Sequence, residues 1–291
     1  MKTRRTDLAL EASELLQEDS QTLSDENGIL IREKQRSGLS VTQVEVTTPS
    51  GAQALGKPMG LYVTLTVENL SRETFPQVAG VIAGELSPFL DPFPGDKPIL
   101  IACLGNRFIT PDAIGPEVHR NIFVTRHLRR DMPEVFEGVR SVASVSAEVL
   151  GNTGIESGEV VHGICRHVNP CCVIAVDALA CRSMHRLCST IQISNTGITP
   201  GSGVGNHRFT LSQQTLGIPV IAVGVPTVVD GATLCADLTG QDCPNSEAAS
   251  LMVTPRDIDS RVAQLSKLLA YGINLALQPG MTVEDLELLL S

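Results

Sequence analysis

The feature that most constrains the fold is a six-residue apolar run, Ile99–Leu104, which stops at a glycine. Apolar residues at consecutive positions are typical of a strand that is buried on both faces of a parallel sheet. Gly105 and Asn106 break the strand, and Asp112 follows in a turn before a helical pattern over residues 115–130. Ligands of open α/β sheets bind beyond the carboxyl ends of the strands. The sequence therefore predicts that Asp112 lies at a functional edge.

A second run of the same kind ends in another aspartate. Residues 173–176 are apolar, Asp177 follows, and Ala178 begins a pattern that predicts a helix. If the two strands are parallel neighbours, Asp112 and Asp177 emerge at the same edge of one sheet, where two carboxylates can act as an acid and base pair. Each aspartate also suits the N-cap of the helix after it, because Asp is favoured there. Both interpretations stay open on these residues alone.

The remaining patterns predict an α/β fold. Strand and helix patterns alternate, which favours right-handed crossovers, and the core must be aliphatic because aromatic residues make up only 3% and Trp is absent. We expect a mostly parallel, twisted sheet covered by helices on both faces, with extra antiparallel strands near the N-terminus. The other predicted strands cover residues 28–33, 40–46, 60–67, 139–145, 190–194 and 219–225, and the predicted helices cover 77–90, 115–130, 156–167 and 256–277.

Two parts of the chain differ in composition. Residues 1–26 are polar with alternating charge, which predicts a mobile N-terminal arm. Residues 27–291 carry the strand and helix patterns, and we expect them to form a single α/β domain. This length can bury a substantial core.

The charge of the chain argues against several functions. A formal net charge of −10 does not suit a phosphate-binding surface, so we expect no direct binding of nucleic acid. The N-terminus has no apolar signal segment, and no apolar stretch approaches the ~20 residues that span a bilayer. We therefore expect a cytoplasmic protein without membrane contact.

Eight cysteines raise the question of metal or thiol chemistry. Cys181, His185 and Cys188 offer three metal ligands but lack a paired C-x-x-C, and reduced structural thiols fit a cytosolic protein better. We expect no metal and no cofactor. A thiol hydrolase would need Cys103 or Cys181 beside a histidine, and no local pattern indicates such a pair.

Six blocks, distributed in order along the chain, resemble the germination (spore) protease family of spore-forming bacteria. They are LGNRFITPDAIGP, TGIESGEVV, VIAVDALACRS, TIQISNTGITPGSGVGNHR, TLGIPVIAVGVPTVVDG and VTPRDID. That family is similar in core fold to the hydrogenase maturation endopeptidases and is described as an atypical aspartic endopeptidase. By position in the blocks, the resemblance implies that Asp112 and Asp177 are the catalytic pair. We expect the more buried Asp177 to be the acid and Asp112 the base, with mildly acidic conditions favouring the single shared proton.

The resemblance also implies a biological setting. The substrates would be small acid-soluble spore proteins, degraded during germination in the forespore cytoplasm, and the enzyme would be a homotetramer made as a self-processing zymogen. Thr6-Asp7-Leu8-Ala9 fits the family's cleavage pattern, so we expect a cut between Asp7 and Leu8 that releases a propeptide of residues 1–7.

Substrate binding is expected from the loops around the two aspartates. A guanidinium can hold an acidic substrate side chain with two hydrogen bonds, and the Gly-rich residues 196–207 can line a cleft. Two alternatives stay open: a metal-handling or hydrogenase-maturation-type peptidase on the same fold, and a non-catalytic binding module. The residues assigned to substrate binding are Asn106, Arg107, Gly203, Arg208 and Asp230.

Overall fold

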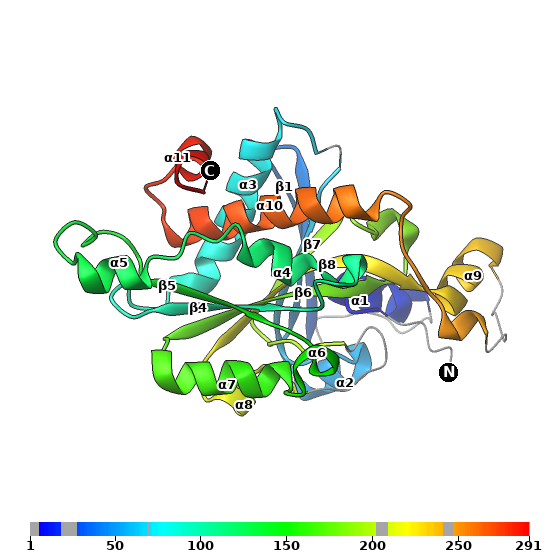
Figure 1. Ribbon diagram of the computed structural model, residues 1–291. Helices are drawn as coiled ribbons and strands as arrows, with labels where there is room; N and C mark the ends of the chain where they lie inside the picture. The colour runs from blue at the N-terminus through cyan, green and yellow to red at the C-terminus, as the bar shows by residue number, and fades with distance from the viewer. Residues whose placement is uncertain (1–5, 19–27, 69, 202–208, 241–246, 291) are drawn as a thin grey trace.

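The computed structural model describes residues 6–18, 28–68, 70–201, 209–240 and 247–290. Their strands join in one mixed sheet with the order β1-β2-β3-β7-β8-β6-β4-β5, and β9 pairs with β8. Helices cover both faces of this sheet (Figure 1). The predicted α/β fold is confirmed: parallel strands form the centre, and antiparallel strands extend it.

The parallel strands are the apolar runs of the sequence. They are β4 (Ile99–Leu104), β5 (Val142–Ala147), β6 (Cys172–Cys181) and β8 (Val220–Asp230). β4 pairs in parallel with β5 and with β6, and β6 pairs in parallel with β8. Every residue of β4 is buried, as the unbroken apolar run predicts.

The antiparallel strands include the three predicted near the N-terminus. β1 (Ile29–Arg36), β2 (Leu39–Val46) and β3 (Gly60–Thr66) form a meander. β7 (Thr190–Ser194) lies antiparallel between β3 and β8, and β9 (Met252–Val253) pairs with the end of β8. β7 thus connects the meander to the parallel strands.

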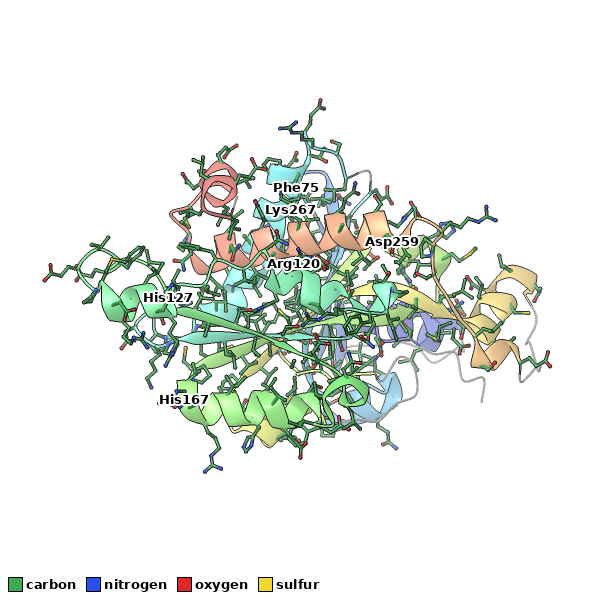
Figure 2. All side chains as sticks on the ribbon, in the orientation of Figure 1. Phe75, Arg120, His127, His167, Asp259 and Lys267 are labelled. Atoms are coloured by element: carbon green, nitrogen blue, oxygen red, sulfur yellow. The ribbon has the colours of Figure 1, made fainter. Side chains whose placement is uncertain are left out.

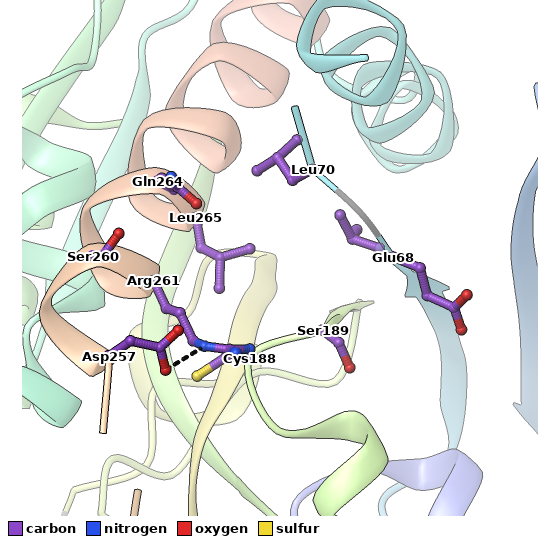
Figure 3. A pocket seen from close by; sticks show the side chains of 10 residues that line it. Glu68, Leu70, Cys188, Ser189, Asp257, Ser260, Arg261, Gln264 and Leu265 are labelled. Atoms are coloured by element: carbon purple, nitrogen blue, oxygen red, sulfur yellow. Dashed lines mark hydrogen bonds and ion pairs between the residues drawn. The ribbon is translucent and has the colours of Figure 1, made fainter. Parts of the chain in front are cut away.

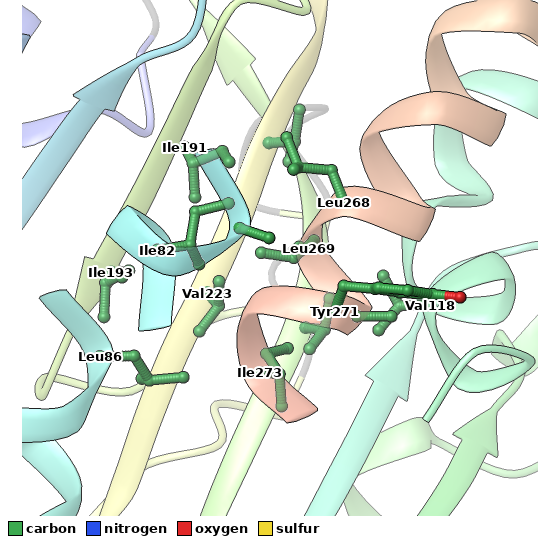
Figure 4. Close-up of a cluster of buried hydrophobic side chains, with 14 of the residues drawn as sticks. Ile82, Leu86, Val118, Ile191, Ile193, Val223, Leu268, Leu269, Tyr271 and Ile273 are labelled. Atoms are coloured by element: carbon green, nitrogen blue, oxygen red, sulfur yellow. The ribbon is translucent and has the colours of Figure 1, made fainter. Parts of the chain in front are cut away.

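One face of the sheet carries most of the core. It is covered by α3 (Phe75–Leu90), α4 (Ile114–His119), α10 (Ile258–Leu277) and α11 (Val283–Leu290). Figure 4 shows α3 and α10 meeting above β7 and β8 through aliphatic side chains. A Cβ at Gly272 would come within 2.5 Å of Ile82, so this glycine lets the two helices approach closely. These two helices also meet where the Lys267 ammonium of α10 lies 5.8 Å from the ring centre of Phe75 at the start of α3 (Figure 2).

The opposite face packs against shorter helices. α7 (Ser157–Val168) and the region of α8 (Gln213–Leu216) cover the parallel strands. α1 (Ala9–Glu18) and α2 (Pro49–Leu55) pack on the meander. The described chain also forms α5 (Arg126–Asp131), α6 (Leu150–Thr153), α9 (Gly231–Thr239) and three short 3-10 turns at Thr110–Asp112, Met184–Arg186 and Ala248–Ser250.

Two predicted helices are wrong. Residues 115–130 form two short helices, α4 and α5, because tertiary contacts hold the chain between them. Asn274 of α10 accepts the Phe123 N–H and donates to the Asn121 carbonyl. The helix predicted after Asp177 does not form: β6 continues to Cys181 because β8 pairs with it along this stretch.

The predicted mobility of the N-terminal arm is wrong for residues 6–18. Leu8 and Ala9 are fully buried, and Glu11 of α1 is buried as well. The Glu11 carboxylate accepts the N–H groups of Arg182 (2.6 Å) and Ser183 (2.9 Å). The segment is therefore anchored just beyond the end of β6. No helix in the described ranges is both long enough and apolar enough to cross a lipid bilayer.

Candidate active site

Asp177 lies on a ledge that β6 forms by extending past its neighbour. β4 pairs with β6 only as far as Val176, whereas β8 continues to pair with β6 as far as Cys181. Asp177 is the first residue of this overhang and is only 4% exposed. Its carboxylate accepts the Ala178 N–H at 2.9 Å.

Asp112 is held beside this ledge by its own turn. Gly105 ends β4 with φ 116°, and a Cβ there would lie 2.1 Å from the Asp112 carbonyl oxygen. The Asn106 N–H donates to that same carbonyl at 2.9 Å. From β8, the Thr227 hydroxyl donates to the Pro111 carbonyl at 2.6 Å. The turn is thus fixed to β4 on one side and to β8 on the other.

Both aspartates line one cavity of about 410 Å³. The predicted juxtaposition of Asp112 and Asp177 is therefore present, although Asp177 lies within a strand and not at its end. Asn106 also lines the cavity, and its side-chain oxygen accepts the Phe108 N–H at 3.0 Å. The lining comes from several segments of the chain: Asp7 near the N-terminus, the Gly105–Asp112 turn, the overhang of β6, and residues of β8 and the β9 region. Val149, Ser157 and the loop residues Pro200 and Gly201 complete it.

The N-terminal segment enters this same cavity. The Asp7 N–H donates to the Ala180 carbonyl at 2.9 Å, and the Ala180 N–H donates to the Asp7 carboxylate at 2.8 Å. Leu8 inserts into an apolar cluster that contains Leu179 and Val229. The predicted cleavage-site residues therefore lie along the ledge that carries Asp177.

A half-buried lysine faces this segment. The Lys57 ammonium donates to the Thr6 carbonyl at 3.0 Å. Burial lowers the pKa of Lys57, and the nearby negative charges of Asp7 and Glu11 oppose that shift. Lys57 thus places a hydrogen-bond donor beside the segment that carries Asp7.

Other predicted substrate-binding residues have different partners. Arg107 is 56% exposed and forms an ion pair with Glu148. Asp230 caps α9, since its carboxylate accepts the Thr233 N–H at 2.9 Å. Gly203 and Arg208 lie outside the described residues.

Three polar residues at the site were missed by the sequence analysis. Gln192 bonds to the N-terminal segment from β7, Lys57 faces Asp7, and Thr227 fixes the turn of Asp112. Gln192 and Thr227 each interrupt an apolar run, which is the one signal that singles them out. Lys57 lies in a loop and carries no such signal.

Thiol and metal sites receive little support. Burial raises the pKa of Cys103 to about 12, so this thiol stays neutral and weakly nucleophilic. A second cavity of about 390 Å³ contains Cys188, where burial raises the thiol pKa to about 11, beside the ion pair of Arg261 and Asp257 (Figure 3). Neither Asp112 nor Asp177 lines this second cavity. Within the described ranges, no three side chains of His, Cys, Asp or Glu are grouped to hold a metal ion.

Comparison with known proteins identifies the family. The family model described as germination protease matches residues 9–240, which is most of the chain. The chain belongs to the germination protease family. The germination protease of Clostridium perfringens is 40% identical, and the match covers 97% of each chain. That of Caldanaerobacter subterraneus subsp. tengcongensis is 41% identical over 98% of each chain.

The family resemblance in the motifs is thereby confirmed, and it places the chain among proteases. A germination protease of Bacillus cereus is 37% identical over 94% of this chain and 93% of the relative. Among solved structures, a [NiFe] hydrogenase maturation protease, HycI from Thermococcus kodakarensis, aligns with 64% of this chain and 98% of its own, at 18% identity and a TM-score of 0.36.

Proposed function

We propose that this germination protease is an endopeptidase of the atypical aspartic type, with Asp112 and Asp177 as its catalytic pair. The observation that carries the proposal is that both carboxylates line the cavity into which the chain's own Asp7 extends. One carboxylate takes a proton from water as the water attacks the carbonyl carbon, and the other acid protonates the leaving amine. Asp177 is the more buried of the two, which supports the acid role for Asp177 and the base role for Asp112.

The proposed substrates are the small acid-soluble spore proteins, in the forespore cytoplasm, with a homotetramer as the acting form. These assignments come from the family resemblance. The contacts of the N-terminal segment support the sequence preference that goes with them. An acidic residue, Asp7, receives a backbone N–H and a lysine charge, an apolar residue, Leu8, is buried, and the small Ala9 follows.

We further propose that the chain is a zymogen that cuts itself between Asp7 and Leu8. The segment is already in the cavity, so the cut needs no encounter between molecules. Asn106 is proposed to contact substrate, because it lines the same cavity. Roles in substrate binding for Arg107, Gly203, Arg208 and Asp230 stay predictions.

The test compares wild type with Asp112→Asn and Asp177→Asn, incubated at mildly acidic and at neutral pH. We expect a new N-terminus at Leu8 in wild type but in neither active-site variant, formed faster in mild acid, because one carboxyl of the pair must hold a proton. N-terminal sequencing and intact mass measure the cut, and circular dichroism checks the fold. Asp259→Asn, at an exposed position of α10, is the matched control.

Two outcomes contradict the proposal. Full activity in either folded active-site variant overturns the aspartic assignment. The same terminus at Leu8 in all four proteins identifies a contaminating protease.

A further inference from the structure

Gln192 holds the N-terminal segment on both sides of one peptide bond. Its Nε2 donates to the Asp7 carbonyl oxygen at 3.2 Å, and its Oε1 accepts the Ala9 N–H at 2.8 Å. The Asp7 carbonyl belongs to the Asp7–Leu8 peptide bond. The orientation of the carboxamide is fixed by its partners, because a carbonyl can only accept and an N–H can only donate.

The sheet gives this side chain a rigid base. Gln192 is 8% exposed, and its strand β7 is paired on both edges, with Thr64 of β3 and Gly224 of β8 opposite Gln192. Side chains on rigid elements keep their geometry better than those on loops.

The same register directs Gln192 toward Asp177. Gly224 of β8 lies opposite Gln192 on one side and opposite Asp177 on the other. Directly paired residues point to the same face of a sheet, so both side chains project from one face, two strand spacings or about 10 Å apart. Gly224 between them has no side chain, and Leu179 fills the space above it. Leu8 and Leu179 belong to one apolar cluster, so the residue after Asp7 lies on the same face of the sheet as the side chains of Gln192 and Asp177.

We propose that Gln192 binds the peptide at the bond to be cut: Nε2–H holds the carbonyl oxygen of that bond, and Oε1 holds the N–H of the second residue after it. This inference rests on the proposed endopeptidase function. When water adds to the carbonyl carbon, a C–O bond forms and the carbonyl electron pair moves onto the oxygen that faces Nε2–H. The water proton goes to the base carboxylate. Collapse breaks the C–N bond, and the acid carboxyl protonates the amine. Because the donor faces the oxygen on which charge develops, Gln192 lowers the barrier of the addition step.

The experiment measures cleavage of a synthetic peptide of this chain's residues 1–16 by full-length wild type, Gln192→Met and Thr190→Val. Thr190 is the matched control: it is buried two residues away on the same face of β7, and its hydroxyl has no hydrogen-bond partner among the described residues. We expect kcat to fall about 10²-fold in Gln192→Met, the loss typical of removing one oxyanion donor, and to stay unchanged in Thr190→Val.

A purely structural role of Gln192 predicts the opposite change in the rate of peptide cleavage. If Gln192 only anchors the chain's own segment, Gln192→Met loosens that segment, opens the cavity and speeds cleavage of the added peptide. If Gln192→Met cleaves the peptide as fast as wild type or faster, the proposed role of Gln192 is wrong. The proposed endopeptidase function still stands in that case, because wild type is active. A wild type that cuts neither itself nor the peptide overturns both.

Gln192→Glu adds a readout in pH. The introduced carboxyl can replace the amide only when it is protonated. Only the protonated form can both donate to the Asp7 carbonyl and accept the Ala9 N–H. Activity of Gln192→Glu should be present at acidic pH and be lost as pH rises through the pKa of that carboxyl, whereas Gln192→Met stays low throughout. A pH profile of Gln192→Glu that parallels the profile of wild type would contradict the assigned hydrogen bonds.

Discussion

Lys57 and Arg107 are two candidates for the side chain that would favour an acidic residue before the proposed cut. The Lys57 ammonium lies close to Asp7, whereas Arg107 is exposed and paired with Glu148. Asp7 and Lys57 are both half-buried, and contacts between partly buried charges are screened less by water than contacts at the surface. We therefore propose that Lys57 would make this selection.

The prediction uses a pair of peptides of residues 1–16 that carry Asp or Asn at position 7. Wild type should prefer the Asp peptide by about tenfold to a hundredfold in kcat/KM, the range for a charge-assisted contact, and Lys57→Met should lose that preference. Arg107→Met is the control and should keep it. Loss of the preference in Arg107→Met alone would return the role to Arg107.

Side-chain roles differ in how far the sequence reveals them. The shared cavity of Asp112 and Asp177 could be predicted, because each follows an apolar run and parallel strands place such residues at one edge; their proposed catalytic roles stay predictions. Gln192 could not be placed in this way, because its partners Asp7 and Ala9 lie 185 and 183 residues away in the chain. Its polar character is visible in the sequence, but its contacts exist only after the sheet has formed.

At the scale of an element, α1 depends on one buried carboxylate. Glu11 is fully buried and accepts two backbone N–H groups, and it forms an ion pair with Arg186 at 3.4 Å. Removing one partner of a buried ion pair costs about 3–5 kcal/mol, because the other charge is left uncompensated. The docking of α1 is therefore sensitive to this single group.

We expect Glu11→Gln to release α1 without unfolding the domain. Hydrogen exchange followed by mass spectrometry should show faster exchange over residues 9–18 and unchanged exchange in α3 and α10. Glu18→Gln is the control: Glu18 is half exposed and pairs with Arg182 at the surface, where a pair contributes about 0–1 kcal/mol. Equal exchange of α1 in both variants would contradict this account of its anchoring.

Elements were predictable where local pattern and tertiary environment agree. β4 and β8 follow from their apolar runs, and the N-terminal meander follows from alternation. The sequence pattern predicted the wrong secondary structure where a residue distant in the chain bonds to the segment. Ala178-Leu179-Ala180 has helical propensity but pairs with β8. The chain leaves the helix after His119, where Asn274 bonds the Asn121 carbonyl and the Phe123 N–H. Such partners cannot be deduced from the segment itself.

At the scale of the whole molecule, the core is closed to solvent and its thiols are protected. Burial raises the pKa of Cys103 and of Cys172 to about 12. Both thiols therefore stay neutral at pH 8, and a thiol must ionise to react. Cys171 and Cys235 are only partly buried.

Differential alkylation tests this closure. Iodoacetamide on the folded protein at pH 8 should modify Cys171 and Cys235 and leave Cys103 and Cys172 unmodified until denaturant is added. Peptidase activity should survive. Loss of activity in step with modification of Cys103 or Cys181 would instead support a thiol nucleophile.

The docking of residues 6–18 on the ledge has a kinetic consequence. A tethered ligand keeps an effective concentration of about millimolar however far the protein is diluted. A cut within this segment is therefore first order, with a half-time that dilution does not change. After a cut between Asp7 and Leu8, α1 still anchors Leu8 and Ala9 in their positions through Glu11. An added substrate must then displace Leu8 and Ala9 before it can bind. The apparent KM of that substrate therefore depends on the free energy of undocking α1 as well as on the substrate's own affinity.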